Sequence, residues 1–150
     1  MLTAEQMSDR LEIQDLFTRY CFAIDDRDWQ ALDDLFTPDA KIDYTATGGS
    51  AGSVSEMKQW LDGALGPCAM SQHMVALPNL TFSGDTATSR MILFNPMMME
   101  DGEGKQSTFF CGVWYHDKLV RTADGWRIAE RSQKLAYMHA TENAKGVRTV

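Results

Sequence analysis

The stretch IQDLFTRYCFAIDDRDWQALDDLFTPDAKIDY, residues 13–44, carries the clearest pattern in the chain. In its first half, apolar side chains recur at steps of three and four residues, at Ile13, Leu16, Phe17, Tyr20 and Ile24. This spacing is typical of an amphipathic helix that lays one face on a core. Upstream, Thr3 and Gln6 form the sequence pattern of a capping box, which favours a helix start there. We therefore predict a helix over residues 4–24.

The second half of this stretch predicts a shorter helix and then a strand. The segment DWQALDDLF, residues 28–36, fits a short helix that Asp28 caps and Pro38 ends. The segment AKIDY, residues 40–44, is expected to form a brief strand.

A third helix is expected after a loop rich in glycine and serine. Ser53 and Glu56 repeat the capping-box pattern, and a glycine–proline pair follows twelve residues of helical character. These signals predict a helix over residues 54–65.

From residue 70 onward the apolar pattern changes to a period of two, which indicates strands. Turn-forming segments such as SGD and TADG separate four expected strands, at 71–82, 85–99, 106–121 and 125–138. Helices followed by an antiparallel meander predict an α+β fold, with the helices packed on one face of a curved sheet. We expect residues 1–150 to form a single domain with a loose polar tail.

Composition and charge exclude several functional classes. The chain has 150 residues, of which 44% are hydrophobic, with a net charge of −7 and no basic cluster. Nucleic acid and membrane surfaces are therefore poor partners. No apolar run approaches a membrane span, and the polar N-terminus does not resemble a signal peptide. Three widely spaced cysteines favour free thiols in a reducing cytoplasm, so we predict a cytoplasmic protein.

Asp25 and His73 are the first candidates for chemistry. Asp25 lies where the first helix is expected to end, among three aspartates in four positions. The helix dipole disfavours a negative charge there, so a desolvated Asp25 is expected to have a raised pKa. His73 lies in MSQHMVAL, and strand alternation puts it on one face with Val75 and Leu77. Each residue also has a purely structural interpretation. Asp25 can be an exposed carboxylate at the end of the helix, and His73 can be a histidine of the core.

Other candidates are less specific. Tyr20 precedes Asp25 by five residues, and both can border one concavity. Arg121 and Arg131 follow apolar strand segments, where either can be an interior cation or a salt-bridge partner. Three methionines from Met97 onward can line an apolar site, a subunit interface or plain core. The chain has no glycine-rich phosphate loop, no G-x-S-x-G and no metal-spaced histidine pair, so we expect no cofactor and no metal.

The quoted stretch of residues 13–44, together with SQHMV (71–75) and DGWRIAERS (124–132), resembles the SnoaL-like branch of the nuclear transport factor two-like superfamily. That branch includes scytalone dehydratase, bile-acid 7α-dehydratase and hexachlorocyclohexane dehydrochlorinase. The resemblance covers about residues 5–138. It implies a cone-shaped α+β barrel, in which helices pack into a strongly curved mixed sheet around a deep apolar pocket. It also implies that the strand near residues 40–44 joins this sheet.

The resemblance also implies roles for particular residues. In the dehydratase and dehydrochlorinase members, an aspartate at the end of the first long helix pairs with a histidine that acts as general base, and Asp25 and His73 match these positions. Tyr20 matches a tyrosine of the bile-acid enzyme, at a position where the dehydrochlorinase has a lysine, which favours dehydration. Arg121 matches a pocket arginine of the dehydrochlorinase. Scytalone dehydratase has a second histidine on the next strand. This chain reads SRMILFN there, at residues 89–95, and has no histidine in that segment.

The resulting hypothesis is a cofactor-free lyase of the dehydratase type that acts on a small hydrophobic, polycyclic or terpenoid-like substrate. Its catalytic residues are His73, Asp25 and Tyr20. Its substrate-binding residues are Arg121, Arg131, Met97, Phe17 and Trp60. The alternatives are an isomerase resembling ketosteroid isomerase and a non-catalytic pocket-bearing subunit, such as the small subunit of a ring-hydroxylating dioxygenase.

We also expect a homo-oligomer, a trimer or a dimer. Both faces of the strand FFCGVWYHDKLV, residues 109–120, are largely apolar, so the convex face of the sheet is expected to be covered as well as the concave face. In this superfamily such a face implies an oligomer, most often a trimer in the dehydratase branch.

Overall fold

The computed structural model describes residues 1–100 and 103–142, and the expected polar tail beyond residue 142 lies outside this range. The helical elements are α1 (Ala4–Asp25), η1 (Gln30–Asp34), η2 (Thr45–Thr47) and α2 (Val54–Leu65). The strands are β1 (Phe36–Asp43), β2 (Ala51–Gly52), β3 (Cys68–Ser71), β4 (Met74–Val75), β5 (Asn79–Ser83), β6 (Thr86–Glu100), β7 (Gln106–Thr122) and β8 (Gly125–Glu142).

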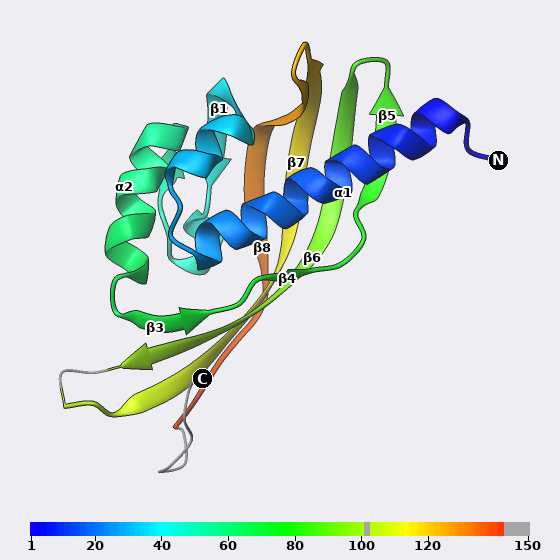
Figure 1. Cartoon of the computed structure of the whole chain (residues 1–150). Helices are drawn as coiled ribbons and strands as arrows, with labels where there is room; N and C mark the ends of the chain where they lie inside the picture. Colours follow the sequence, from blue (N-terminus) through cyan, green and yellow to red (C-terminus); the bar gives the residue numbers. More distant parts are fainter. Residues whose placement is uncertain (101–102, 143–150) are drawn as a thin grey trace.

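The strands form one mixed, curved sheet that does not close on itself. Its order is β2-β1-β8-β7-β6-β3, and β4 and β5 also pair with β6. The pairing of β1 with β8 is parallel, whereas the other pairings are antiparallel. Figure 1 shows α1 crossing one face of the sheet on a diagonal, with α2 beside its C-terminal half. The α+β cone with a mixed sheet is therefore confirmed, including the place of the first strand in the sheet.

The first helix is built as its sequence predicts. Thr3 accepts a hydrogen bond from the Gln6 backbone N–H, and the Gln6 side chain accepts one from Thr3, so the capping box forms. The apolar stripe is buried against the sheet, with exposed fractions between 0% and 2% for its five members. The second capping box, between Ser53 and Glu56, opens α2 at the expected residue. Both helices thus start where local hydrogen bonding favours it.

The expected helix over residues 28–36 is wrong in extent and type. The segment forms only the 3-10 helix η1, and the chain is already in β1 at Phe36. Pro38 lies inside this strand and does not end a helix. The pairing of β1 with β8 shifts register between Phe36 and Lys41, and such an irregularity tolerates a residue that has no N–H to donate. Asp28 still accepts a hydrogen bond from the Ala31 N–H at 3.2 Å.

The expected strand over residues 71–82 is three short strands, β3, β4 and β5. Each pairs in turn with a different part of β6, and the residues between them interrupt the regular pairing. The predicted common face of His73, Val75 and Leu77 is therefore wrong, because Leu77 is 75% exposed while the His73 side chain is 7% exposed. His73 lies between β3 and β4, so its inward orientation depends on tertiary contacts and not on strand alternation.

The outer face of the sheet carries exposed apolar side chains. Ile92 is 56% exposed and Tyr137 is 49% exposed, while the rings of Phe94 and Phe110 stack at 5.9 Å. An apolar outer face is what the sequence predicted for a sheet that is covered on both sides. The homo-oligomer that would cover it stays a prediction. No helix of the described part of the chain is long and apolar enough to cross a membrane. Cys21, Cys68 and Cys111 are buried free thiols.

Candidate functional site

Asp25, the last residue of α1, makes three hydrogen bonds with the chain around β3. Its Oδ1 lies 2.7 Å from Nδ1 of His73, and its Oδ2 accepts a hydrogen bond of 2.7 Å from the His73 backbone N–H. Ser71 donates a third bond to Oδ1 at 2.9 Å. The Asp25 and His73 side chains are 17% and 7% exposed. Of the three neighbouring aspartates, Asp25 is therefore the one that points inward.

The turn after α1 explains how a carboxylate is tolerated at a helix C-terminus. Arg27 adopts a left-handed backbone conformation with φ of 60°. Its guanidinium donates hydrogen bonds to the carbonyls of Ile24 and Asp25, at 2.8 Å and 3.1 Å, and to Ser71 Oγ at 2.9 Å. A cation at these carbonyls offsets the negative end of the helix dipole. Arg27 also fixes the serine that donates to Asp25.

The expectation of a raised pKa for Asp25 is wrong. Burial acts to raise the pKa of this carboxyl, but the hydrogen bonds from the His73 ring and backbone, with that from Ser71, outweigh it and lower the pKa below its ordinary value. Asp25 is thus a carboxylate that orients and supports the imidazole. With the Nδ1 hydrogen donated to Asp25, the lone pair of a neutral His73 ring lies on Nε2.

Asn95, on β6, is the residue next to that second ring nitrogen. Its Nδ2 lies 3.2 Å from His73 Nε2. Sequence reasoning examined the segment 89–95 only for a second histidine and missed the asparagine. A buried amide on the strand facing a candidate histidine is the signal that could have found it, once the pairing of β4 with β6 was known.

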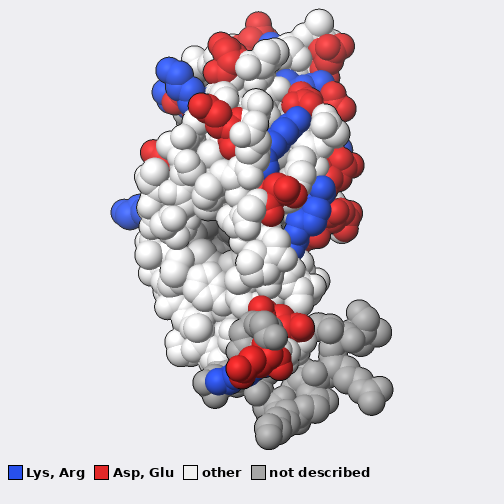
Figure 2. Space-filling view, turned by 90° about the vertical axis from the view of Figure 1, so that its left-hand side faces the viewer, with Lys and Arg blue, Asp and Glu red and all other residues white. Residues whose placement is uncertain are grey.

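A cavity of about 350 Å³ lies between the helices and the concave side of the sheet. Its polar lining includes Tyr20, Tyr44, His73 and Asn95. Its apolar lining includes Ile24, Trp60, Leu61, Leu93, Met97 and Val113. Figure 2 shows a recess, bordered by uncharged side chains, on the face of the molecule where α2 and β3 lie. The arrangement suits an apolar ligand that presents a few polar atoms.

Two tyrosine hydroxyls meet at the wall of this cavity. Tyr20 and Tyr44 share a hydrogen bond of 2.6 Å, and both side chains are buried. One hydroxyl donates to the other, which leaves one O–H free to donate into the cavity. Burial, reinforced by the neighbouring Tyr20, raises the pKa of Tyr44 well above its ordinary value, so this hydroxyl keeps its proton. Tyr44 was not among the residues that the sequence singled out.

The family profile of the SnoaL-like domain matches residues 5–132. The chain belongs to the SnoaL-like family. An uncharacterized protein of Mycobacterium tuberculosis is 49% identical to it over 131 residues, which cover 87% of this chain and 88% of that protein. A protein of Mycobacterium bovis, also uncharacterized, matches with the same identity and coverage.

Solved structures share the fold at low sequence identity. A putative scytalone dehydratase from Novosphingobium aromaticivorans superposes with a TM-score of 0.80 at 18% identity, covering 98% of this chain and 94% of that one. A hexachlorocyclohexane dehydrochlorinase superposes with a TM-score of 0.77 at 19% identity, covering 96% and 94%. A nuclear transport factor 2-like superfamily protein from Salmonella enterica gives 0.71 at 18% identity, covering 94% and 95%. These matches show that the SnoaL-like chain shares its fold with these proteins.

Of the five residues expected to bind substrate, Trp60 and Met97 line the cavity of this SnoaL-like chain and three do not. The Arg131 side chain is 0% exposed and bonds Asp117 at 2.7 Å. Phe17 packs beneath the same guanidinium, with 5.3 Å between the ring centroid and Cζ. Arg131 also lies 4.2 Å from the Tyr20 ring centroid, so its charge sits behind the tyrosine pair and not at the cavity surface.

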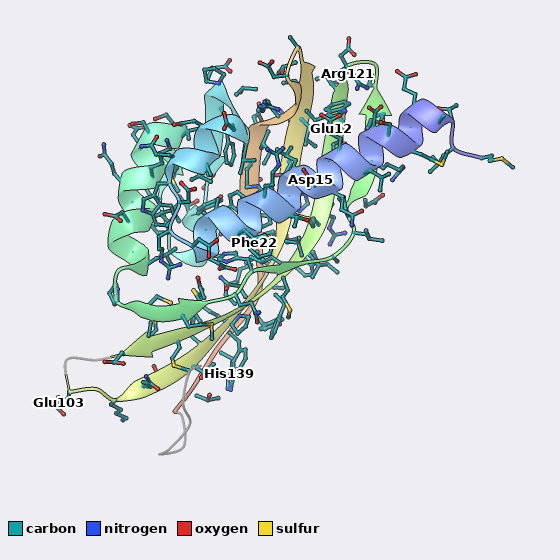
Figure 3. All side chains as sticks on the ribbon, in the orientation of Figure 1. Glu12, Asp15, Phe22, Glu103, Arg121 and His139 are labelled. Carbon is teal, nitrogen blue, oxygen red and sulfur yellow. The ribbon has the colours of Figure 1, made fainter. Side chains whose placement is uncertain are left out.

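Arg121 lies at another part of the molecule. Its guanidinium makes two hydrogen bonds to Asp9, at 2.7 Å and 2.8 Å, and one to Asp85. Figure 3 shows it at the end of the sheet beside the N-terminal half of α1, close to Glu12. Opposite charges on α1 and on the turn after β5 hold it there, so it ties the helix to the sheet and does not line the cavity.

The residues of the site do not resemble a metal centre. Within residues 1–100 and 103–142, no three His, Cys, Asp or Glu side chains are grouped so that they could hold a metal ion. The imidazole and phenol groups at the cavity, with the carboxylate of Asp25 behind the imidazole, can instead move or hold protons. The absence of a cofactor from the reaction stays a prediction.

Proposed function

We propose that the cavity is the active site of a cofactor-free lyase of the dehydratase type. His73 takes a proton from carbon of a hydrophobic substrate, and Asp25 holds the imidazole in the required tautomer. The observation that carries the proposal is the contact of 2.7 Å between Asp25 Oδ1 and His73 Nδ1, at the wall of a largely apolar cavity. A carboxylate on Nδ1 makes Nε2 the basic nitrogen and stabilises the imidazolium that forms.

The reaction is an elimination that balances without an added reagent. The C–H bond α to a carbonyl breaks, and its proton forms an N–H bond at Nε2 of His73. The electron pair of that bond becomes the new C=C bond, while the adjacent C–O bond breaks and its oxygen leaves with the bonding pair. This oxygen takes the proton that Nε2 of His73 gained and departs as water, which returns the imidazole to its neutral state. The free hydroxyl of the Tyr20–Tyr44 pair donates a hydrogen bond to the oxygen on which charge develops.

The buried Arg131 supports the same step. Burial acts to lower its pKa, but Asp117 and the nearby tyrosine hydroxyls raise it well above the ordinary value, so the guanidinium stays charged. Its Cζ lies 4.2 Å from the Tyr20 ring centroid and 4.3 Å from that of Tyr115. A fixed positive charge behind the tyrosine pair favours negative charge on an oxygen in front of it.

The substrate class follows from the cavity. A volume of about 350 Å³ is near the lower end of the range for small-molecule sites, so a compact molecule of one or two rings fits better than a larger one. The apolar lining favours a carbocyclic, terpenoid-like skeleton that carries a carbonyl and a hydroxyl. Solved structures that share this chain's fold are named as a hexachlorocyclohexane dehydrochlorinase and a putative scytalone dehydratase, which agrees with elimination chemistry.

An isomerase is the second candidate, and the tyrosine pair favours it equally. The same base and the same oxyanion donors would serve a reaction in which the proton returns to a different carbon. The two reactions differ in whether water is lost.

The test uses β-hydroxy ketones with one and two carbocyclic rings, together with their β,γ-unsaturated counterparts, in ²H₂O. A dehydratase converts the hydroxy ketones to conjugated enones, seen by ultraviolet absorbance, and an isomerase converts only the unsaturated ketones. Deuterium incorporation at the α carbon, measured by mass spectrometry, reports proton abstraction even without product. Wild-type protein that binds these ketones but catalyses neither exchange nor conversion would instead favour a binding subunit.

A further inference from the structure

Asn95 has an unusual hydrogen-bonding environment at one end of its side chain. Its amide nitrogen faces Nε2 of His73 at 3.2 Å. Its Oδ1 is buried and has no hydrogen-bond partner among the described residues. The residue is 6% exposed and lines the cavity that His73 also lines. Buried amide oxygens are normally paired, so this orphaned end requires an explanation.

The two protonation states of His73 need opposite partners at Nε2. In the neutral ring with its hydrogen on Nδ1, Nε2 is an acceptor, and the Asn95 amide hydrogen satisfies it. In the imidazolium, Nε2 carries a hydrogen and needs an acceptor. A half turn about the Cβ–Cγ bond of Asn95 exchanges Oδ1 and Nδ2 with almost no change in side-chain shape.

In the described part of the chain, no hydrogen bond to Oδ1 opposes this rotation of the Asn95 amide. If Oδ1 accepted a hydrogen bond from another group, turning the amide would break that bond. Because no such bond exists among the described residues, only His73 determines which end of the amide faces it. The remaining ligands of the imidazole do not change, since Asp25 accepts from Nδ1 in both states.

We propose that Asn95 is a positioning residue whose amide turns over when His73 takes up a proton, so that it holds Nε2 in both states. Before proton transfer, the amide hydrogen covers the lone pair of Nε2, and at 3.2 Å this is a long contact that an incoming substrate displaces. After transfer, Oδ1 accepts from the new N–H. The proposal rests on His73 as the base of the proposed function, but its hydrogen-bond geometry can be measured without turnover.

Other groups near His73 can also carry charge. From α1 these are Asp25 and Cys21, and from the following turn Arg27, which acts through Ser71. From β7, Cys111 faces Asn95 across the strand pair and has a pKa raised by burial, so it stays a neutral thiol. The phenols of Tyr20, Tyr44 and Tyr115 line the same cavity. Only Asp25 and Asn95 contact the ring nitrogens of His73 in the described part of the chain.

The first measurement needs no variant. The full chain, labelled with ¹⁵N in histidine and asparagine, is titrated between about pH 4 and 9 around the ordinary histidine pKa. We expect the neutral His73 ring to show its hydrogen on Nδ1, and the Asn95 NH₂ signals to shift with the same midpoint as the ring. Asn95 signals that do not respond while His73 titrates would overturn the proposal.

Two variants then separate positioning from structure. In Asn95→Leu both states of the ring lose their partner at Nε2, but the imidazolium loses the stronger, charge-assisted hydrogen bond, so the proton affinity of His73 is expected to fall about tenfold or more. In Asn95→Asp the added carboxylate is expected to raise that affinity about tenfold or more. The opposite shifts of the two variants distinguish a contact with Nε2 from a general loss of packing.

Asn79→Asp is the control for added charge, because Asn79 is exposed on β5 and does not contact the ring. It should leave the His73 midpoint unchanged. A midpoint in Asn95→Leu equal to that of the wild type would also contradict the proposal. If the midpoints move as expected while no ketone exchanges deuterium, the proposed function fails and the role of Asn95 stands. If deuterium exchange occurs while the His73 midpoints do not move, the proposed function stands and the role of Asn95 fails.

Discussion

Asp25 binds His73 through both of its carboxylate oxygens, Oδ1 facing the ring Nδ1 at 2.7 Å and Oδ2 accepting from the backbone N–H of the same residue at 2.7 Å. The carboxylate therefore positions the histidine main chain and side chain together, across 48 residues of sequence. A ring held in this way cannot turn to present its other nitrogen.

Removing the base should abolish most of the proton transfer. We expect His73→Ala to lower the rate of deuterium exchange or enone formation by about 10²–10⁴, the usual contribution of a general base. Asp25→Asn should lose much of the same factor, because an amide can stabilise the wrong tautomer and carries no charge. The double variant should be little worse than either single one, since the two residues act as a unit. Asp26→Asn, at the exposed neighbouring carboxylate, is the control. Full activity of a folded His73→Ala protein would contradict the catalytic role.

The two tyrosines should contribute unequally. Tyr44 retains its proton and can donate to Tyr20, which leaves the Tyr20 hydrogen for the substrate. Tyr20→Phe should therefore lower kcat by about ten- to a thousandfold, and Tyr44→Phe by less. Steady-state kinetics with the ketone panel measure both. Tyr137→Phe, at a half-exposed phenol outside the cavity, should leave kcat unchanged. A loss of kcat in Tyr137→Phe equal to that in Tyr20→Phe would contradict the role of the tyrosine pair.

The buried Arg131–Asp117 pair should matter for stability when only one partner is removed. Both side chains are 0% exposed, so Asp117→Asn leaves a buried cation without its counter-ion, at a cost of about 3–5 kcal/mol in the free energy of unfolding. Urea titration measures this. Replacing both residues, as Arg131→Met with Asp117→Leu, should recover most of the loss. Glu130→Gln, in the exposed Lys118–Glu130 pair on the same two strands, should cost under about 1 kcal/mol.

Asp9 should make stability depend on acid pH. Hydrogen bonds from Arg121 and Trp126 outweigh burial and lower the pKa of Asp9 in the folded chain below its unfolded value. The folded state then binds fewer protons, so the stabilisation is complete above about pH 4 and is lost as pH falls through the lowered pKa. Asp9→Asn should lower the melting temperature at pH 7, and the difference from the wild type should disappear in strong acid. A difference that stays constant with pH would show that charge is not the cause.

The outer face of the sheet should mediate self-association. Exposed Ile92 and Tyr137, with the stacked Phe94 and Phe110, would be covered in a homo-oligomer. Light scattering at micromolar concentration should give a trimer or a dimer, and Ile92→Glu should shift it toward monomer. Ile13→Val, in the core, controls for general destabilisation. A monomeric wild-type protein would contradict this expectation.

Local sequence alone determined the two long helices and the general class of the fold. Capping boxes and helical spacing act over a few residues, so Thr3–Gln6 and Ser53–Glu56 predicted the starts of α1 and α2 correctly. Period-two patterning located β6, β7 and β8, because long strands repeat it many times. The family pattern then indicated Asp25 and His73, whose residue types and positions are visible in the sequence.

Only the tertiary structure decided which side chains meet at the cavity. Asn95 comes from β6 and Tyr44 directly follows β1. Their contacts with His73 and Tyr20 depend on strand register and on the helix diagonal across the sheet. Arg121 and Arg131 share a residue type and a position on long strands, yet Asp9 holds one near the end of the sheet and Asp117 holds the other in the core. Their partners lie 112 and 14 residues away in the chain, and no short-range pattern encodes such pairings. Packing brings these charges and hydroxyls together, since most buried polar groups are paired with whatever partner the fold provides.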